Sequence, residues 1–303
     1  MYIGIDGGGT KTKGILIDDD QQIITEAVAG PSSLRSNPPA VWLESLTTVI
    51  KSLTAQAKTP IKAIFTGLGD VSSGADQETI KTALHAALPQ LKAMPLWVDN
   101  DVLNAHASSF LGEEGIILIA GTGSVVYGID QHQQTHRVGG YSYTEGDEGS
   151  AFHLGWLTLK LLGRVFDQRA SHSELTQRCF KHFKLETFED MVALYERHHT
   201  DRSAVAALAP WVTEAAAHGD EHAQTIIEHA TESVMEMIET VVNRLDFNKR
   251  RVAFIGSLAQ LDTPYKQSLT KKINAFDPTF TWLDARNDPA FGAALIAQKR
   301  HLN

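Results

Sequence analysis

The chain opens with Ile3-Gly4-Ile5-Asp6-Gly7-Gly8-Gly9-Thr10-Lys11-Thr12, in which a strand runs into three glycines. A second strand, Lys13–Ile17, follows directly, and a turn leads to a third strand, Ile23–Val28. Glycines inside a β-hairpin differ from those of a Rossmann turn, which open a helix, and the Walker A pattern is absent. Without a Cβ, such a loop lets backbone N–H groups approach phosphate oxygens, and Asp6 can face the metal ion that accompanies them.

The same pattern returns in the second half of the chain. A buried strand, Glu114–Ile119, ends in Ala120-Gly121-Thr122-Gly123-Ser124 and returns as Val125–Ile129. Two strand–loop–strand units indicate an internal duplication. Hairpin turns often contain glycine without any ligand, so the second loop gains its meaning from the first. Together the two loops predict a site for the phosphates of a nucleoside triphosphate.

Two pairs of motifs carry a family resemblance. Asp6-Gly7-Gly8-Gly9-Thr10 and Gly121-Thr122-Gly123-Ser124 resemble the phosphate motifs of the actin-like superfamily of sugar kinases, heat-shock chaperones and actin. Gly139-Gly140-Tyr141 and Gly146-Asp147-Glu148-Gly149-Ser150 resemble the N-acetylglucosamine/glucosamine kinase family of the BadF/BadG/BcrA/BcrD ATPase group. The motifs stand in the family's order over nearly the whole chain.

This resemblance implies an α/β fold with two ribonuclease-H-like, actin-like ATPase domains and a nucleotide cleft between them. It also implies ATP and Mg2+ as cofactors and a small amino sugar as substrate. Relatives are often homodimers, so a second copy of the chain is an expected partner. A cell would use such an enzyme in amino-sugar salvage.

The composition excludes several other classes of protein. A net charge of −9 argues against a nucleic-acid binder, which would present a basic face. Cys179 is the only cysteine, so one chain forms neither a disulfide framework nor an all-cysteine metal site. The N-terminus lacks the pattern of a signal peptide, and no run approaches the roughly 18 apolar residues of a membrane span. We therefore expect a cytoplasmic protein that binds no membrane.

With 303 residues, the chain is long enough for two domains. Residues 1–112 are expected to form the first domain together with a last helix, residues 289–303, which packs back on it in the actin-like fold. Residues 113–288 are expected to form the second domain, with a hinge at Gly112-Glu113-Glu114-Gly115. Three antiparallel strands followed by alternating helices and strands fit a ribonuclease-H-like mixed sheet in the first half.

Apolar spacing and turn residues predict the remaining elements. In the first half these are strands Ile61–Thr66 and Leu96–Val98 and helices Val41–Gln56, Gln77–Ala87 and Asp101–Phe110. The second half is expected to continue after its hairpin as helices, with two late strands. Its helices are Gly149–Phe166, Ser173–Phe183, Thr187–Arg197, Ala204–His218, Ala223–Leu245 and Pro289–Lys299, and its strands are Arg251–Ile255 and Phe280–Leu283.

Asp101 is the expected catalytic base. It follows a strand within Asp99-Asn100-Asp101, at the carboxyl end of the sheet where α/β proteins bind ligands. Phosphoryl transfer to a sugar hydroxyl needs a carboxylate that accepts the hydroxyl proton. One of the two aspartates can instead be the N-cap of the helix that starts here, a role that suits Asp99 better. By resemblance, Asp101 occupies the family's base position, and Asn100 precedes it.

The loops supply the expected nucleotide contacts. Asp6 would hold Mg2+ through water, unless it only hydrogen-bonds the glycine loop as a turn aspartate. Lys11 offers a cation to phosphate or is a solvated turn lysine. Residues 254–258 resemble the family's adenosine motif, with Ser257 in place of a second glycine. The complete expected nucleotide set is Asp6, Gly7, Gly8, Gly9, Thr10, Lys11, Thr12, Gly121, Thr122, Gly123, Ser124, Gly256 and Ser257.

The resemblance also implies the sugar contacts. Asp147 stands where the family contacts sugar hydroxyls, although acidic residues at such a position commonly cap a helix. Tyr141 replaces a frequent Trp, and Ser33 or Leu34 falls where relatives often have an Asn. Such changes shift specificity strongly, so the identity of the sugar stays open. The expected substrate set is Ser33, Leu34, Asn100, Asp101, Gly140, Tyr141 and Asp147.

These residues predict ATP-dependent phosphorylation of N-acetylglucosamine or glucosamine at the 6-hydroxyl. One alternative is a kinase of another amino sugar, such as N-acetylmuramic acid. A second is a BadF-type ATPase that drives electron transfer through an iron–sulfur cluster, for which Cys179 would have to supply the ligands. A third is a sugar sensor or chaperone-like nucleotide switch, although a protein without catalysis would be expected to lose Asp101.

Overall fold

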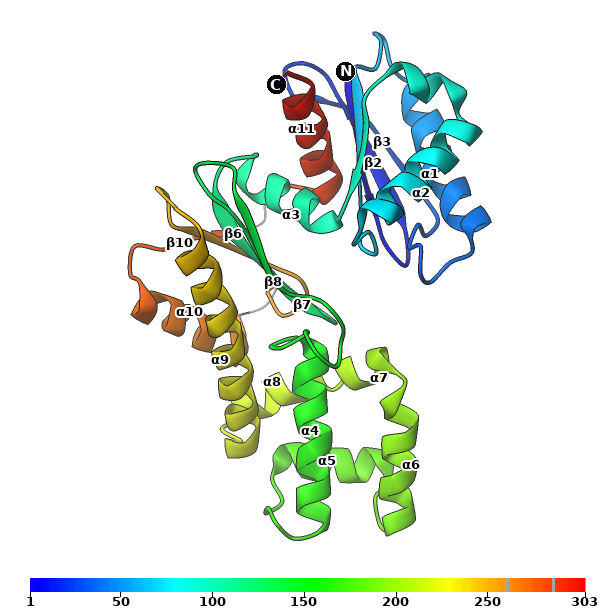
Figure 1. Cartoon of the computed structure of the whole chain (residues 1–303). Coiled ribbons are helices and arrows are strands. Elements are labelled where there is room, and N and C mark those ends of the chain that lie inside the picture. The colour runs from blue at the N-terminus through cyan, green and yellow to red at the C-terminus, as the bar shows by residue number, and fades with distance from the viewer. Residues whose placement is uncertain (260–261, 285–286, 303) are drawn as a thin grey trace. The chain divides into compact units, whose positions relative to one another are not determined.

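The computed structural model describes residues 1–259, 262–284 and 287–302 (Figure 1). The chain divides into two compact units, Met1–Glu113 with Ala285–Asn303, and Glu114–Asp284. The expected divisions, after residues 112 and 288, lie near these. Each unit is built on one mixed five-stranded sheet. In the part of the chain that the structure describes, no helix is both long and apolar enough to cross a bilayer.

The first sheet has the strand order β3-β2-β1-β4-β5. Its strands are β1 (Tyr2–Gly7), β2 (Thr12–Ile17), β3 (Ile23–Ala29), β4 (Ala63–Leu68) and β5 (Leu96–Asp99). Strands β1 to β3 are antiparallel, whereas β4 is parallel to both β1 and β5. The carboxyl ends of β1, β4 and β5 therefore share one edge of the sheet, from which the first glycine loop and the segment with Asp101 leave.

Helices cover both faces of the first sheet (Figure 1). They are α1 (Pro39–Ala55), α2 (Gly74–Ala87), α3 (Asp101–Phe110) and α11 (Pro289–Leu302), with a 3-10 turn at Pro89–Ala93. Alternate residues of each strand serve opposite faces: Ile3 and Ile5 join the core under α1 and α2, and Tyr2 joins the core under α11. Gly4 lies against the backbone of α11, where any Cβ would collide with Ala294.

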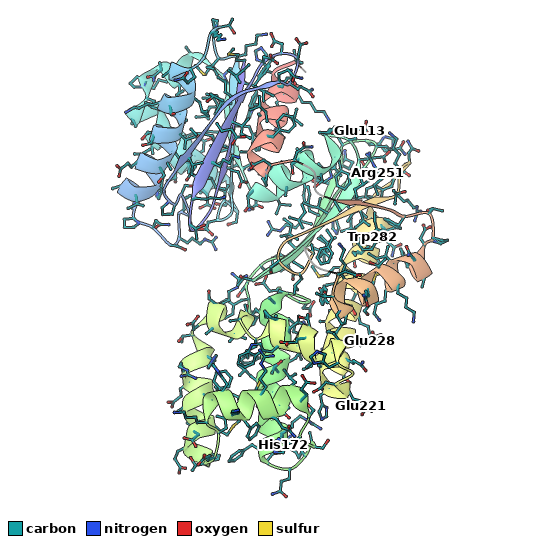
Figure 2. All side chains as sticks on the ribbon, turned by 180° about the vertical axis from the view of Figure 1, so that it is seen from behind. Glu113, His172, Glu221, Glu228, Arg251 and Trp282 are labelled. Carbon is teal, nitrogen blue, oxygen red and sulfur yellow. The ribbon has the colours of Figure 1, made fainter. Side chains whose placement is uncertain are left out.

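The second sheet repeats the arrangement of the first, with the order β10-β9-β6-β7-β8. Its strands are β6 (Gly115–Ala120), β7 (Ser124–Ile129), β8 (Thr135–Gly139), β9 (Arg251–Ile255) and β10 (Thr281–Asp284). Three antiparallel strands are again followed by two parallel ones. Arg251 and Trp282, labelled in Figure 2, lie on the neighbouring strands β9 and β10. The internal duplication predicted from the glycine loops thus extends to whole sheets.

The second unit is richer in helices than the first. They are α4 (Ala151–Phe166), α5 (Glu174–Phe183), α6 (Phe188–His199), α7 (Arg202–Ala206), α8 (Ala209–Ala217), α9 (Glu221–Arg244) and α10 (Pro264–Phe276). Buried residues of α4, α8 and α9 form one hydrophobic core with strands β6, β7 and β9. Helix α4 begins beside the second glycine loop, and this start positions much of the site described below.

Three predictions of elements were wrong. Strand β8 was missed because Thr135-His136-Arg137 carries little apolar signal on a partly exposed edge strand. Helix α10 was missed, although Thr263 and Pro264 are a regular helix start. The single helix expected from Ala204 to His218 is two, α7 and α8, because Pro210 lacks the N–H that a continuous helix needs.

Candidate active site

Asn100, and neither aspartate beside it, caps helix α3. Its Oδ1 accepts a hydrogen bond from the N–H of Val102 at 3.1 Å, and its Nδ2 donates to the carbonyl of Val71 at 2.9 Å. The alternative in which Asp99 or Asp101 is the N-cap is therefore wrong. Asp101 is the first residue of α3 and is half-buried, so its carboxylate is placed at the sheet edge without serving as the cap.

The loop that follows β4 passes close to the carboxylate of Asp101. A Cβ built on Gly69 would lie 3.1 Å from Oδ2 of Asp101. The carbonyl of Gly69 also accepts a hydrogen bond from Nδ2 of Asn100 at 3.3 Å. The β4 and β5 loops therefore form one structure around the expected base.

Asp6 lies on β1 beside the same helix. Its Oδ1 accepts a hydrogen bond from Nδ2 of Asn104, on α3, at 2.7 Å. Burial raises the pKa of Asp6 to about 7, the bond from Asn104 opposes that shift, and the negative charges of Asp101 and Asp288 add to it. The carboxylates of Asp6 and Asp101 are thus close enough for the charge of Asp101 to raise the pKa of Asp6.

Asp6 fits the expected role at a magnesium ion. Burial beside the negative charges of Asp101 and Asp288 makes this position favourable for a divalent cation. Among the described residues, no group of three His, Cys, Asp or Glu side chains could by itself hold a metal. Mg2+ usually keeps several waters and binds one or two carboxylates together with substrate phosphates, which suits a single carboxylate such as Asp6.

Backbone hydrogen bonds fix the first glycine loop, and space remains beside Gly8 and Gly9. The N–H of Gly8 donates to the carbonyl of Lys11 at 3.1 Å, and the carbonyl of Gly8 accepts from the N–H of Ser32 at 2.9 Å. Apart from the adjoining residues, no atom of the described chain lies within 4 Å of the position that a Cβ would take on Gly8 or on Gly9. Thr10 and Lys11 are exposed beside them. This loop can therefore admit a ligand against its backbone.

Two residues of the first loop instead have structural roles. A Cβ on Gly7 would collide with the side chains of Ser32 and Leu68, so this glycine serves close packing. Thr12 is fully buried, and its hydroxyl donates to the carbonyl of Gly30 at 2.7 Å. The Thr12 hydroxyl, which was expected at the phosphates, is thus bonded to the residue that follows β3.

The segment with Ser33 and Leu34 is held by contacts inside the first unit. Ser33 is buried, and its hydroxyl donates to Oδ2 of Asp70, which also accepts from the N–H of Arg35 at 3.2 Å. Leu34 packs against the core under α1 and α2. Sequence reasoning missed Asp70, although it follows β4 directly and β4 lies beside the strand that precedes Asp101.

The second glycine loop is bound to the start of α4. The N–H of Ala151 donates to the carbonyl of Gly121 at 2.8 Å, and the N–H of Phe152 donates to that of Thr122 at 3.3 Å. The expected adenosine motif adjoins this loop, because a Cβ on Gly121 would lie 3.8 Å from Oγ of Ser257. Gly256 has a φ of +108°, and its missing Cβ leaves room for the carbonyl of Ala120.

Asp147 is not open to solvent. Its side chain is only 5% exposed, its Oδ1 accepts from the N–H of Ser124 at 3.2 Å, and its Oδ2 pairs with the guanidinium of Arg202. The N–H of Gly140 donates to the carbonyl of Gly146 at 2.8 Å, and this bond closes the loop between the two glycines. Tyr141 is 77% exposed. Sequence reasoning missed Arg202, which lies 55 positions from its partner.

His153 bonds to Gly149 and so fixes the end of the segment that contains Asp147, Gly146–Ser150, called the Asp147 segment below. Its Nδ1 accepts a hydrogen bond from the N–H of Gly149 at 2.9 Å, which requires that nitrogen to be unprotonated. Burial lowers the pKa of His153 to about 4, and the nearby His229 and Lys160 contribute to the shift. The imidazole is therefore neutral near pH 7 and works as a structural acceptor.

Comparison with known proteins identifies the family. The sequence pattern of the BadF/BadG/BcrA/BcrD ATPase family matches residues 3–297. The chain belongs to the BadF/BadG/BcrA/BcrD ATPase family. The match spans both units, so both glycine loops and the segment with Asp101 lie inside it.

Three members of the wider group of sugar kinases are similar over almost their whole length. An N-acetylmuramic acid/N-acetylglucosamine kinase of Clostridium acetobutylicum is 29% identical over 98% of this chain and 97% of its own. An N-acetyl-D-glucosamine kinase of Dictyostelium discoideum is 27% identical over 98% and 97%. The crystal structure of a Chromobacterium violaceum protein assigned as an N-acetylglucosamine kinase matches with a TM-score of 0.73 at 26% identity, over 97% of both chains. The fold is thus that of actin-like sugar kinases.

Within this family, the state of Cys179 bears on the electron-transfer alternative. The side chain is fully buried in α5, and burial raises the pKa of its thiol to about 12. A cluster ligand must be a thiolate that is accessible to iron. The one cysteine of this BadF-family member is therefore a core residue.

Proposed function

We propose that this chain is an ATP-dependent amino-sugar kinase that phosphorylates the 6-hydroxyl of N-acetylglucosamine or glucosamine, with Asp101 as general base. The observation that carries the proposal is the placement of Asp101 at the carboxyl end of β5, beside Gly69 and near Asp6. The substrate class is supported by the relatives, which are kinases of N-acetylglucosamine and N-acetylmuramic acid.

In the proposed reaction, Asp101 orients the 6-hydroxyl and accepts its proton while the hydroxyl oxygen attacks the γ-phosphorus of ATP. The new O–P bond forms as the bond from that phosphorus to the bridging oxygen breaks, and ADP leaves with the electron pair. Asn100 holds the first turn of α3 in place, which keeps the carboxylate of Asp101 aligned.

The two glycine loops are proposed to bind the phosphates, and Gly256 and Ser257 the adenosine. Asp6 would hold Mg2+ through water, where the ion neutralises charge on the phosphates. Lys11 is exposed on the first loop and can add a positive charge there. Gly8 and Gly9 provide open backbone for phosphate oxygens.

N-Acetylmuramic acid is a second candidate substrate. The Clostridium acetobutylicum relative acts on this sugar as well as on N-acetylglucosamine. The exposed Tyr141 and the hydroxyl of Ser33, which is bonded to Asp70, support this candidate, because both would leave the proposed sugar site with fewer fixed polar contacts. A pocket with fewer fixed polar contacts tolerates a larger substituent on the sugar.

A coupled ADP-release assay with Mg-ATP tests the proposal across glucosamine, N-acetylglucosamine, N-acetylmuramic acid, glucose and water alone. Asp101→Asn should remove the sugar-stimulated rate by at least about 100-fold, as expected for loss of a general base. Asp99→Asn is the matched control, because the carboxylate of Asp99 accepts the N–H of Asn100 and pairs with Arg300 at 3.6 Å. NMR of the product should place the phosphate on O6.

Three results would contradict the proposal. Equal ADP release with and without sugar would favour an ATPase. No turnover with any sugar, but binding of one of them, would favour a sensor. A phosphate on another oxygen would remove the assignment of the 6-hydroxyl.

A further inference from the structure

Arg202 lies directly on the second glycine loop. It is the first residue of the short helix α7, whose N-cap Asp201 accepts the N–H of Ala204 at 2.9 Å. Any Cβ on Gly123 would collide with Nη2 of Arg202 and crowd the carboxylate of Asp147. The guanidinium also lies 5.9 Å from the ring centre of Tyr143. The loop glycine, the cation and its carboxylate partner therefore form one packed unit.

The donors of Arg202 exceed the acceptors around it. A guanidinium has five N–H donors, and Nη2 uses one on Asp147. Nε is buried and has no hydrogen-bond partner among the residues that the structure describes. The side chain is still 40% exposed, so the rest of its charge faces outward. A buried donor without a partner, next to an exposed part of the same cation, indicates a site that an anion completes.

The first N–H groups of α4, beside the second loop, are already bonded within the protein. Helix N-termini commonly bind anions, but here Ala151 and Phe152 use their N–H groups on the carbonyls of Gly121 and Thr122. The N–H of His153 donates to Oγ of Ser150 at 3.1 Å. Since the protein itself satisfies the start of α4, the cation packed on Gly123, Arg202, is the group of this loop that we consider for a phosphate.

We propose that Arg202 binds the phosphoryl group that ATP transfers, and that Asp147 is a positioning residue that holds the guanidinium against Gly123. The inference rests on the proposed kinase function and assigns one further residue to it. A planar guanidinium forms two parallel hydrogen bonds to phosphoryl oxygens and matches the charge that spreads over them during transfer. Arg202 makes and breaks no bond; it stabilises the group as it passes from ADP to the sugar oxygen.

A phosphoryl group explains the geometry better than an acidic substituent on the sugar. Gly123 belongs to the expected phosphate loop, and the guanidinium is packed on that residue, not on the exposed Tyr141. The carboxylate of Asp147 is 5% exposed, and its Oδ2 holds the guanidinium beside this loop. The sugar contact that the resemblance implied for Asp147 stays a prediction.

The test compares Arg202→Gln, Arg202→Lys and Asp147→Asn by turnover and by nucleotide binding. Arg202→Gln should lower kcat by about 100- to 1000-fold with both glucosamine and N-acetylglucosamine. Arg202→Lys should recover part of that loss, since lysine restores the positive charge but cannot form two parallel hydrogen bonds. Asp147→Asn should lower kcat less than Arg202→Gln does, because the guanidinium remains but is held less firmly.

Arg178→Gln is the matched control. Arg178 lies on α5, is 43% exposed, pairs with Glu214 and stacks 4.6 Å from the ring centre of Trp211. Its loss should leave kcat within about two-fold, because an exposed ion pair contributes little. Thermal unfolding of each variant checks that the fold is kept.

Binding provides a readout that needs no turnover. A non-hydrolysable ATP analogue should lose at least about ten-fold in affinity in Arg202→Gln, whereas ADP should change by less than about three-fold. Equal losses for analogue and ADP would overturn the assignment to the transferred group. A loss of rate confined to N-acetylmuramic acid would also overturn it, in favour of the sugar carboxylate. If the wild type binds both nucleotides but phosphorylates no sugar, the kinase proposal fails while the binding comparison still decides the role of Arg202.

Discussion

Asn104 donates a hydrogen bond from Nδ2 to Oδ1 of Asp6 over 2.7 Å, and this contact joins helix α3 to strand β1. The same nitrogen also lies 3.3 Å from the carbonyls of Ile5 and Gly67, so Asn104 bridges two neighbouring strands. Asp101 lies one turn earlier on α3. A single buried amide, that of Asn104, therefore fixes the position of the expected base, Asp101, relative to the expected metal-facing carboxylate, Asp6.

Replacing Asn104 with alanine should weaken both the fold and the reaction. Loss of a buried amide that serves Asp6 and two carbonyls should lower the free energy of unfolding by about 2–3 kcal/mol. The rate of sugar phosphorylation should fall about ten-fold or more, because α3 is no longer fastened to β1. Urea unfolding and the ADP-release assay measure the two effects.

Ser109→Ala is the control on the same helix. Ser109 is half-buried, and its hydroxyl donates only to the carbonyl of Ala105 one turn back, at 2.8 Å. This change should cost less than about 0.5 kcal/mol. Equal stability of the two variants would show that the bridge through Asn104 is unimportant.

Asp6→Asn should stabilise the ligand-free protein while it removes activity. The folded protein raises the pKa of Asp6 from 3.8 to about 7, chiefly by burial, so the folded state binds the extra proton between these values. Asp6 therefore reduces stability as the pH rises through this window. The free energy of unfolding of Asp6→Asn should exceed that of the wild type by on the order of 2–4 kcal/mol at pH 8 and by almost nothing at pH 4. Its kinase rate should fall about 100-fold.

The measurement is urea unfolding at pH 4, 6 and 8 without magnesium or nucleotide. Asp20→Asn, at an exposed turn position, is the control for loss of one negative charge. A stability difference between Asp6→Asn and wild type that does not change with pH would contradict the raised pKa.

His153 predicts an acid sensitivity of the second unit. Its pKa is lowered from 6.5 to about 4, chiefly by burial, so the unfolded chain binds the proton more readily. Stability should therefore fall as the pH drops from about 6.5 to about 4, by up to about 2–3 kcal/mol. Protonation would also end the acceptance of the Gly149 N–H by Nδ1. Activity should decline over the same range as the Asp147 segment loosens.

His153→Gln separates titration from packing, because an amide oxygen can accept the same N–H but does not titrate. The variant should show a shallower loss of stability between pH 6.5 and 4 than the wild type. His222→Gln is the control, since His222 is partly exposed and its Nε2 contacts the carbonyl of Ser171 at 3.1 Å. Identical pH profiles for His153→Gln and wild type would exclude His153 as the cause.

Local signals account for what the sequence predicted correctly. The glycine loops and the strands around them lie next to one another in the chain, so the duplicated hairpins and the placement of Asp101 and Asp6 could be predicted from short patterns. The parallel strands follow from alternating helices and strands. Strand β8 was the exception, because an edge strand with few apolar residues gives no clear period.

Contacts between distant segments account for what it could not predict. Ser33 meets Asp70 across 37 positions, and Asp147 meets Arg202 across 55. Nothing local marks either pair: Arg202 begins a five-residue helix, and Asp70 lies in a short loop. The internal partners of Ser33 and Asp147 therefore could not be predicted from the sequence, whereas their expected contacts with the sugar stay predictions.

Gly69→Ala should slow the reaction without unfolding the protein. The new methyl group would lie 3.1 Å from Oδ2 of Asp101, tighter than an ordinary contact, so the carboxylate must shift. A displacement of a few tenths of an ångström at a catalytic group should lower kcat about ten-fold. Gly74→Ala is the control, because outside its own helix and chain neighbours no described atom lies within 4 Å of its Cβ position. If both variants retain the wild-type kcat, the close approach of Gly69 to Asp101 has no part in catalysis; a loss in Gly69→Ala alone ties the rate to the position of this one carboxylate.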